Sequence, residues 1–235
     1  MNNQILRLKL KQRLNKLSSN DYDNLENWQI IEAFNKAQVE WVRRMLHGNN
    51  LYKEGDELSK RRIDDLQILL TELPLVGTSN DQYFQTTNFP PANYLEYKRV
   101  STNAVTECCP DPRSMTVYLG EVANVDLYLR DPLKRPDFEW GETFATLINN
   151  DVNIYTNHDF EITSADLAYY RQPIKIQIQG CVDPYTNVQS TVNVECEFKD
   201  DIIELIIDEA VGILAGDIES GNQYTRGVEG AERNN

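Results

Sequence analysis

The residues best suited to acid–base chemistry or metal binding are few, and they lie far apart in the sequence. The chain of 235 residues has two histidines, His47 and His158, and neither belongs to a spacing typical of catalytic or metal sites. We interpret His47 as the end of a helix, where a cationic ring suits the helix dipole, and His158 as a turn residue. The sequence also lacks glycine-rich phosphate loops and the Gly-x-Ser-x-Gly pattern of hydrolases. We therefore expect no catalytic residues, no cofactor and no enzymatic activity.

The cysteines and the acidic pairs do not have the spacing of a metal site. Structural zinc sites present paired ligands two to four residues apart, whereas Cys108 and Cys109 are adjacent. We interpret the four cysteines as reduced, small, buried hydrophobic residues. The pairs Asp64–Asp65, Asp200–Asp201 and Asp208–Glu209 could contribute to a cation site, but neighbouring residues on a helix point about 100° apart. We expect them to be solvated or to lie at helix starts, and we expect no metal.

Charge is distributed unevenly along the chain. The formal net charge is −14; residues 1–70 hold 12 basic and 10 acidic residues, and the remainder holds 11 basic and 27 acidic ones. A mostly acidic body argues against wrapping a nucleic acid duplex, because such binding depends on neutralising phosphates. The exception is a basic N-terminal arm, whose residues are candidate contacts to another subunit: Arg7, Lys9, Lys11 and Arg13. The same arm leaves an alternative open, a soluble nucleic-acid-binding or processing protein.

Hydrophobic periodicity predicts an α+β fold. Residues 1–73 form an N-terminal helical region, with helices expected over 4–18, 27–47 and 57–72. Proline, glycine and polar residues predict a linker over 74–93. Residues 94–198 form a β-rich domain, a central antiparallel sheet or small sandwich. Its strands are expected over 94–100, 115–119, 125–129, 143–148, 152–155, 168–170, 174–178 and 192–198.

The last predicted helix lies within residues 199–219 and is followed by a flexible tail over 220–235. Its apolar face, over 202–216, is wider than a surface helix usually needs. We expect this amphipathic helix to pack on the sheet and to offer part of its face to a neighbouring subunit. The candidate contacts on that face are Ile203, Ile207 and Leu214.

The hydropathy pattern predicts no membrane-spanning helix, because no segment approaches eighteen uninterrupted apolar residues. The first residues lead into an alternation of leucine with lysine and arginine, without the apolar segment of an export signal. We expect a protein that is not exported by the usual route and has no membrane partner.

Several segments together resemble a structural protein of tailed bacteriophages, of the crAss-like group infecting gut Bacteroides. The segments that carry this resemblance are Ile5–Leu17, Ile31–Lys36, Phe138–Leu147, Leu167–Pro173 and Glu197–Glu219. They extend over nearly the whole chain, so the resemblance concerns the full length and not a shared module.

The resemblance implies a virion protein of the phage neck, made in the cytoplasm of the host bacterium. Such a head-to-tail connector forms a homo-oligomeric ring, of twelve copies to match a portal, between the portal protein and other neck or tail ring proteins. DNA would pass through its channel without sequence-specific binding. The basic residues of the arm would then meet the acidic remainder of a neighbouring copy or of the portal.

Overall fold

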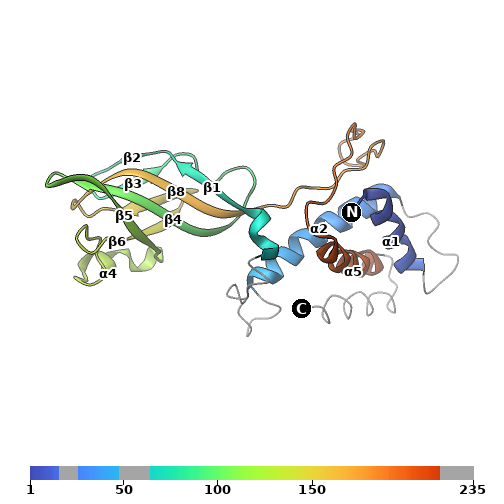
Figure 1. Ribbon diagram of the computed structural model, residues 1–235, viewed down its shortest axis with the longest axis horizontal. Helices are drawn as coiled ribbons and strands as arrows, with labels where there is room; N and C mark the ends of the chain where they lie inside the picture. Colours follow the sequence, from blue (N-terminus) through green and yellow to red (C-terminus); the bar gives the residue numbers. More distant parts are fainter. Residues whose placement is uncertain (16–25, 48–63, 218–235) are drawn as a thin grey trace. The chain divides into compact units, whose positions relative to one another are not determined.

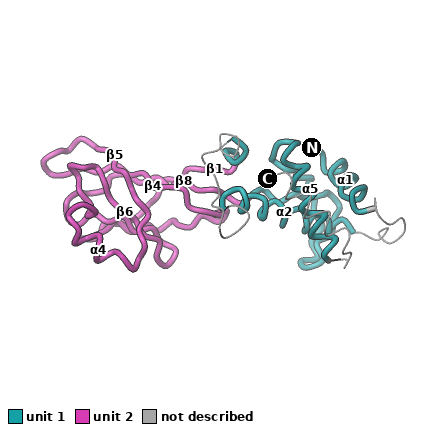
Figure 2. The backbone as a smooth tube through the Cα atoms, turned by 90° about the horizontal axis from the view of Figure 1, so that it is seen from below, with its two compact units in different colours: residues 1–68, 173–235 teal, residues 69–172 magenta. Residues whose placement is uncertain are grey.

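The computed structural model describes residues 1–15, 26–47 and 64–217 of the chain. The chain divides into two compact units, coloured separately in Figure 2. Unit 1 combines Met1–Ile68 with Pro173–Asn235, and unit 2 is the continuous segment Leu69–Gln172. Unit 2 is therefore inserted, in sequence, between the two parts of unit 1.

The described part of unit 1 contains the long helices α1 (Asn3–Asn15), α2 (Asn27–His47) and α5 (Asp200–Asp217) (Figure 1). The predicted helix over 27–47 is confirmed at both ends, and α5 confirms the helix expected within 199–219. For the helix expected over 4–18, α1 confirms the described part, since residues 16–18 lie outside the described residues. The helices and the sheet together confirm the α+β class.

The apolar faces of these helices meet each other. α5 packs on both α2 and α1, and α1 contributes a row of leucines at four-residue spacing, Leu6, Leu10 and Leu14, all buried. Burying one leucine or isoleucine side chain contributes about 1.5–3 kcal/mol. We expected the broad face of the last helix to lie on the sheet; its described partners are α2 and α1.

The segment that follows α2 departs from the prediction. Residues 57–63 of the helix expected over 57–72 lie outside the described residues, and Asp64–Leu66 are helical. The 3₁₀ turn η1 (Gln67–Leu69) then leads directly into strand β1 (Leu70–Leu75), so the helix prediction is wrong from Leu70 onward. Pairing with a neighbouring strand overrides the local helical pattern, and β1 tolerates its proline because it lies at a sheet edge.

The residues predicted as a linker over 74–93 instead contain strands. They include the end of β1, then β2 (Gly77–Ser79) and β3 (Tyr83–Thr86). The other strands of unit 2 are β4 (Tyr94–Thr106), β5 (Cys109–Leu119), β6 (Glu142–Ile148), β7 (Asp151–Tyr155) and β8 (Glu161–Arg171). The linker prediction is wrong because short strands that contain polar residues have the same composition as a loop.

The eight strands form one mixed sheet in the order β1-β8-β4-β5-β6-β7-β3-β2. Every pairing is antiparallel except that of β5 with β6, where Thr116 is opposite Glu142 in a parallel ladder. The expectation of an antiparallel sheet therefore needs correction at this pair. Parallel strands cannot be joined by a tight turn, so β5 and β6 need a longer crossover connection.

That crossover explains another wrong prediction. Residues 125–129 alternate like a strand, but they lie in the short helix α4 (Val125–Arg130), preceded by the 3₁₀ turn η2 (Val122–Asn124). Both elements belong to the connection from β5 to β6. The alternation of apolar and polar residues over 125–129 therefore does not produce a strand, because this segment belongs to the crossover that the parallel pairing of β5 and β6 requires.

The strands expected over 174–178 and 192–198 are also not formed. These residues belong to unit 1, and their ladder is reduced to an isolated bridge between Gln177 and Val194. Side chains of the helices satisfy the backbone instead: Ile176 N donates to Asn35 Oδ1 at 2.8 Å, and the buried Asn3 donates to the carbonyl oxygens of Gln177 and Val194 at 2.9 and 2.8 Å. The segment is held as an extended, irregular chain on the helices.

The core of unit 2 draws on strands from both ends of the sheet. The cluster contains Leu75, Phe84, Val100, Ala145, Val152, Ile154, Ala165, Leu167 and Tyr169. Because β1 and β3 lie near opposite ends of the strand order and yet share this cluster, the sheet is curled (Figure 1). Asn88 ties the same region together, accepting from Val76 N and donating to Pro74 O, both at 2.9 Å.

Gly77→Ala is expected to lower the free energy of unfolding by about 1–3 kcal/mol. A Cβ at Gly77 would lie 2.2 Å from the backbone oxygen of Gln85, so β2 and β3 would have to separate. Thr78→Ala on the same strand is the control, because the Thr78 side chain is exposed. Urea denaturation measures both variants, and equal destabilisation by the two would contradict the close approach.

Candidate functional site

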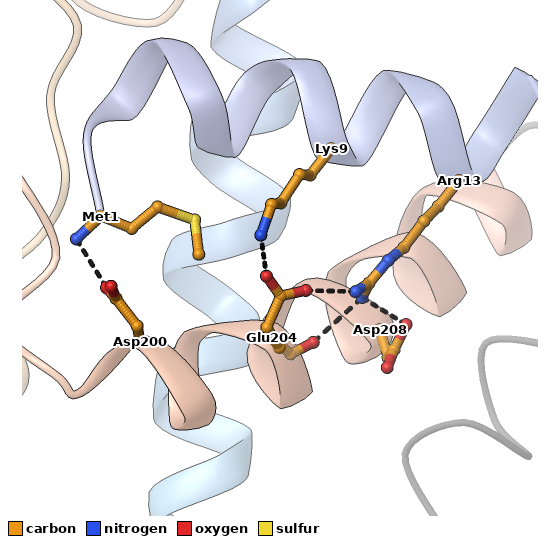
Figure 3. Close-up of polar contacts among 6 residues, drawn as sticks. All are labelled: Met1, Lys9, Arg13, Asp200, Glu204 and Asp208. Carbon is orange, nitrogen blue, oxygen red and sulfur yellow. Dashed lines mark hydrogen bonds and ion pairs between the residues drawn. The ribbon is translucent and has the colours of Figure 1, made fainter.

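One side of α5 carries acidic side chains at four-residue spacing, and α1 lies along it (Figure 3). Residues four apart share a helix face, so these carboxylates form one row: Asp200, Glu204 and Asp208. Lys9 binds Glu204, and Arg13 binds both Glu204 and Asp208. At the start of the row, the Met1 ammonium lies 2.9 Å from Asp200 Oδ1. The order of the contacts shows that α1 and α5 run in the same direction.

Asp200 is exposed, whereas Glu204 and Asp208 are partly buried and each is paired with a cation of α1. Burial raises the pKa of Asp208, Arg13 opposes that rise, and the charge of Glu204 adds to it. Arg13 also donates from Nη1 to the backbone oxygen of Glu204 at 3.0 Å. Arg13 therefore bridges both carboxylates, while Lys9 binds Glu204 alone.

The four basic residues predicted as candidate contacts thus have different environments. Lys9 and Arg13 are engaged within the chain, and Arg7 Nη1 donates to Asn27 Oδ1 at 3.1 Å, which links α1 to α2. Lys11 forms no ion pair among the residues that the structure describes. The basic arm consequently holds the helices of unit 1 together.

The three apolar candidates on α5 lie inside the same unit. Ile203 and Ile207 are fully buried, and Leu214 is almost fully buried. Their neighbours on the face, including Ile202 and Ile206, are buried as well. The chain's own helices therefore cover the face that we expected to be offered partly to another subunit.

A further ion pair joins α2 to α5. Arg44 binds Glu209, whose side chain is only 6% exposed. Burial raises the pKa of Glu209 to about 7; Arg44 opposes this rise and the charge of Glu40 adds to it. A buried acid of this kind makes the stability of the helical unit sensitive to pH near neutrality.

The histidines and cysteines do not gather into a site. His47 is the last residue of α2, and His158 is an exposed turn residue with φ of 61°, as interpreted from the sequence. Cys196 is buried, and burial raises its pKa to about 11. The interpretation of buried cysteines is confirmed only for Cys196: Cys181 is half-buried, and Cys108 and Cys109 are exposed where β4 turns into β5. Over residues 1–15, 26–47 and 64–217, no three His, Cys, Asp or Glu residues are grouped to hold a metal ion.

An exposed apolar surface lies on the crossover side of unit 2. Tyr118, Leu119 and Leu133 are exposed and line a pocket of about 260 Å³ that is also lined by Tyr128 and Phe144. These three exposed side chains, with the cations that accompany them in the crossover, are called the α4 patch. The cations are Arg130, Lys134 and Arg135, all exposed.

The α4 patch is held in shape by local contacts. Tyr128 and Phe144 pack edge to face with ring centroids 5.3 Å apart, and the Lys134 ammonium lies 5.6 Å from the centroid of the Tyr128 ring. Asp131 Oδ1 accepts from Leu133 N at 3.0 Å, which fixes the turn after α4. The patch is thus preorganised and not a loose loop.

Unit 1 carries an exposed apolar turn of its own. Val182, Tyr185 and Val188 project from residues 182–188, called the 183 loop, and Tyr185 is 75% exposed. Asp183 organises the loop by accepting from Tyr185 N and Thr186 Oγ1, both at 2.9 Å. These hydrogen bonds, with that from Tyr185 N the stronger influence, lower the pKa of Asp183, which keeps it charged.

Neither the α4 patch nor the 183 loop is predicted from the sequence as a surface. The Asp183–Pro184 pair signals a turn, but exposure of the surrounding valines and tyrosine depends on tertiary structure. Apolar and polar residues of the crossover alternate at the strand period. The sequence therefore predicts a strand there and does not indicate that its apolar side chains are exposed.

The chain matches no protein-family model, and a search of curated proteins finds no match. Among the described helices, none combines the length and the apolar character needed to cross a bilayer.

Arg13→Ala is expected to lower the free energy of unfolding by about 1–2 kcal/mol, because Glu204 and Asp208 lose their shared cation in a half-buried row. Lys11→Ala is the matched control on the same helix and should change stability by less than about 0.5 kcal/mol. Chemical denaturation of the full chain measures both. Equal free energies of unfolding for the two variants would show that the ion pairs between α1 and α5 do not stabilise the fold.

Glu209→Gln is expected to flatten the pH dependence of stability between pH 4.5 and about 7. Folding raises the pKa of Glu209 from 4.5 to about 7, so the folded chain holds this proton more tightly than the unfolded chain. The resulting stabilisation is complete below pH 4.5 and is lost as the pH rises through 7.

Over that range, the wild type should therefore lose about 1–3 kcal/mol more of its free energy of unfolding than the variant does. Urea titrations across the range provide the measurement. Parallel pH profiles for the two proteins would show that Glu209 does not titrate as described.

Proposed function

We propose that the chain is a structural subunit that forms a ring in the head-to-tail connector of a tailed bacteriophage, joining portal to tail around the DNA channel. The resemblance over nearly the whole sequence motivates the type of assembly. The observation that carries the proposal is the presence, on each unit, of an exposed apolar surface fixed by its own hydrogen bonds: the α4 patch and the 183 loop.

Such surfaces favour a protein that works by contact. Contiguous apolar patches on a protein surface mark sites of interaction, whereas single exposed apolar residues are ordinary. Because the turn of the 183 loop and the turn after α4 are already ordered, a partner need not immobilise them on binding. That preorganisation supports stable association between identical copies.

The charge of the chain agrees with a DNA channel. The residues beyond position 70 hold 27 acidic and 11 basic side chains, so a channel wall built from them offers few anchors for phosphates. DNA would then pass through without being retained. The ring, of twelve copies if it matches a portal, would sit in the virion neck.

Nucleic-acid binding through the N-terminal helix is the weaker alternative. Two of its cations, Lys9 and Arg13, are already paired with Glu204 and Asp208. Binding phosphates would require those half-buried ion pairs to break. The contacts of α1 therefore favour the ring over a nucleic-acid-binding protein.

Negative-stain imaging together with light scattering of the purified full chain tests the proposal. We expect closed rings of one copy number, formed by the chain alone or on addition of portal protein. A strictly monomeric chain that retards labelled DNA at physiological salt would contradict the proposal and favour the alternative.

A further inference from the structure

We propose that Asn3 is the positioning residue of the 183 loop: it fixes the base of the hairpin that carries the loop, and so sets the direction in which the loop meets a neighbouring copy. The inference rests on the ring proposed above, in which the 183 loop is a contact surface, and it adds the residue that orients this surface. The hairpin, residues 177–194, is called the arm; it precedes α5 in the chain and projects from the helices of unit 1 (Figure 1).

Hydrogen bonds join the two strands of the arm from its base to its tip. At the base, Gln177 N donates to Val194 O at 3.1 Å, and Val194 N donates to Gln177 O at 2.9 Å. Ser190 Oγ donates to Gln177 Oε1 at 3.1 Å, and near the tip Asp183 N donates to Val188 O at 3.1 Å. Because each bond ties one strand to the other, the orientation of the base determines where the 183 loop points.

The Asn3 carboxamide holds both strands of the base at once. Its nitrogen Nδ2 donates to Val194 O at 2.8 Å, and to Gln177 O and Asn193 Oδ1 at 2.9 Å each. A carbonyl oxygen has two lone pairs, so the Gln177 and Val194 oxygens accept from Asn3 in addition to the amide of the opposite strand. Asn3 is only 1% exposed, so water does not readily replace it at the base.

The oxygen of the same side chain shows what the carboxamide contributes. Asn3 Oδ1 is buried and accepts no hydrogen bond from the residues that the structure describes. Burying a polar atom without a partner costs free energy, so an interface that only needs filling favours an apolar residue, such as Leu6 and Leu10 farther along α1. What Asn3 adds over such a residue is its donor, and all three acceptors belong to the arm.

The place of Asn3 follows from the docking of α1 on α5. The ion pairs of Lys9 and Arg13 with carboxylates of α5 fix α1 along that helix, and Asn3 is the first residue of α1. The helix that closes unit 1 from the N-terminal side therefore also holds the arm. In this way a buried contact sets the orientation of an exposed surface.

α2 supports the arm from one side. Trp28 and Asn35 are seven residues apart, so they share one face of α2. Asn35 Oδ1 accepts from Ile176 N at 2.8 Å just before the arm begins, and the Trp28 ring meets the Tyr185 ring edge to face near the tip, with centroids 6.4 Å apart. Without the donor of Asn3, the arm would keep these contacts and could pivot about them.

Asn3→Asp tests the role, because this change keeps the shape of the side chain and removes its donor. The introduced carboxylate would face three oxygen atoms without a proton to share, so the base of the arm should open. Asn2→Asp is the matched control: it adds the same charge at the neighbouring residue, which is exposed and whose Oδ1 already accepts from Gln4 N at 2.9 Å. Asn3→Ala removes the donor without adding a charge, so the test does not depend on one variant folding.

Hydrogen exchange of the monomeric full chain measures the order of the arm, and negative-stain imaging measures assembly. We expect the amides of Gln177, Asp183 and Val194 to exchange at least tenfold faster in Asn3→Asp than in the wild type, and faster to a lesser degree in Asn3→Ala. Asn2→Asp should match the wild type. With its helices shown by circular dichroism to be intact, Asn3→Asp should also form rings at a yield at least threefold lower.

Three outcomes would overturn the inference. Equal exchange of the arm amides in Asn3→Asp, Asn3→Ala and Asn2→Asp would show that Asn3 does not position the arm. Faster exchange with an unchanged ring yield would show that assembly does not depend on the orientation of the 183 loop, and would leave the ring intact. A wild-type chain that forms no ring would contradict the proposed function and the role of Asn3 in assembly, while the exchange comparison would still decide whether Asn3 anchors the arm.

Discussion

The burial of α5 against α1 and α2 is the interaction on which the rest of the structure depends. α1 and α2 precede the sheet in sequence and α5 follows it, so their packing joins the two sequence segments that make up unit 1. The apolar face of α5 is buried against these helices, and the ion pairs from Lys9 and Arg13 to Glu204 and Asp208 link α5 to one face of α1. Because α5 is covered within its own chain, contacts between copies have to use other surfaces.

Much of the helical part could be predicted from the sequence, because the apolar residues of α2 and α5 recur at the helical period over many turns. The failures have a common physical cause. Leu70–Leu75 and Val125–Arg130 are short segments whose structure is decided by pairing with β8 and by the crossover between parallel strands. Over 174–178 the alternation is real, but Asn35 takes the place of a partner strand. Local patterns are reliable where they are long and unreliable where a distant part of the chain completes the hydrogen bonds.

The same limit applies to the candidate site. That the basic arm would meet acidic residues could be predicted from charge alone, but the partner found in the structure is the chain's own last helix. A usable signal was present, since Asp200, Glu204 and Asp208 stand four residues apart and match the spacing of Lys9 and Arg13. The α4 patch and the 183 loop gave no comparable signal, because exposure of an apolar side chain is a property of the folded chain.

The most direct test is hydrogen exchange of the full chain, compared between dilute monomer and assembled particle. We predict that the amides of Ile202–Ala215 are protected equally in both states, because α5 is buried within each copy. New protection on assembly should be confined to residues 118–135 and 181–189. An α5 that exchanges freely in the monomer and becomes protected only in the assembly would contradict the account.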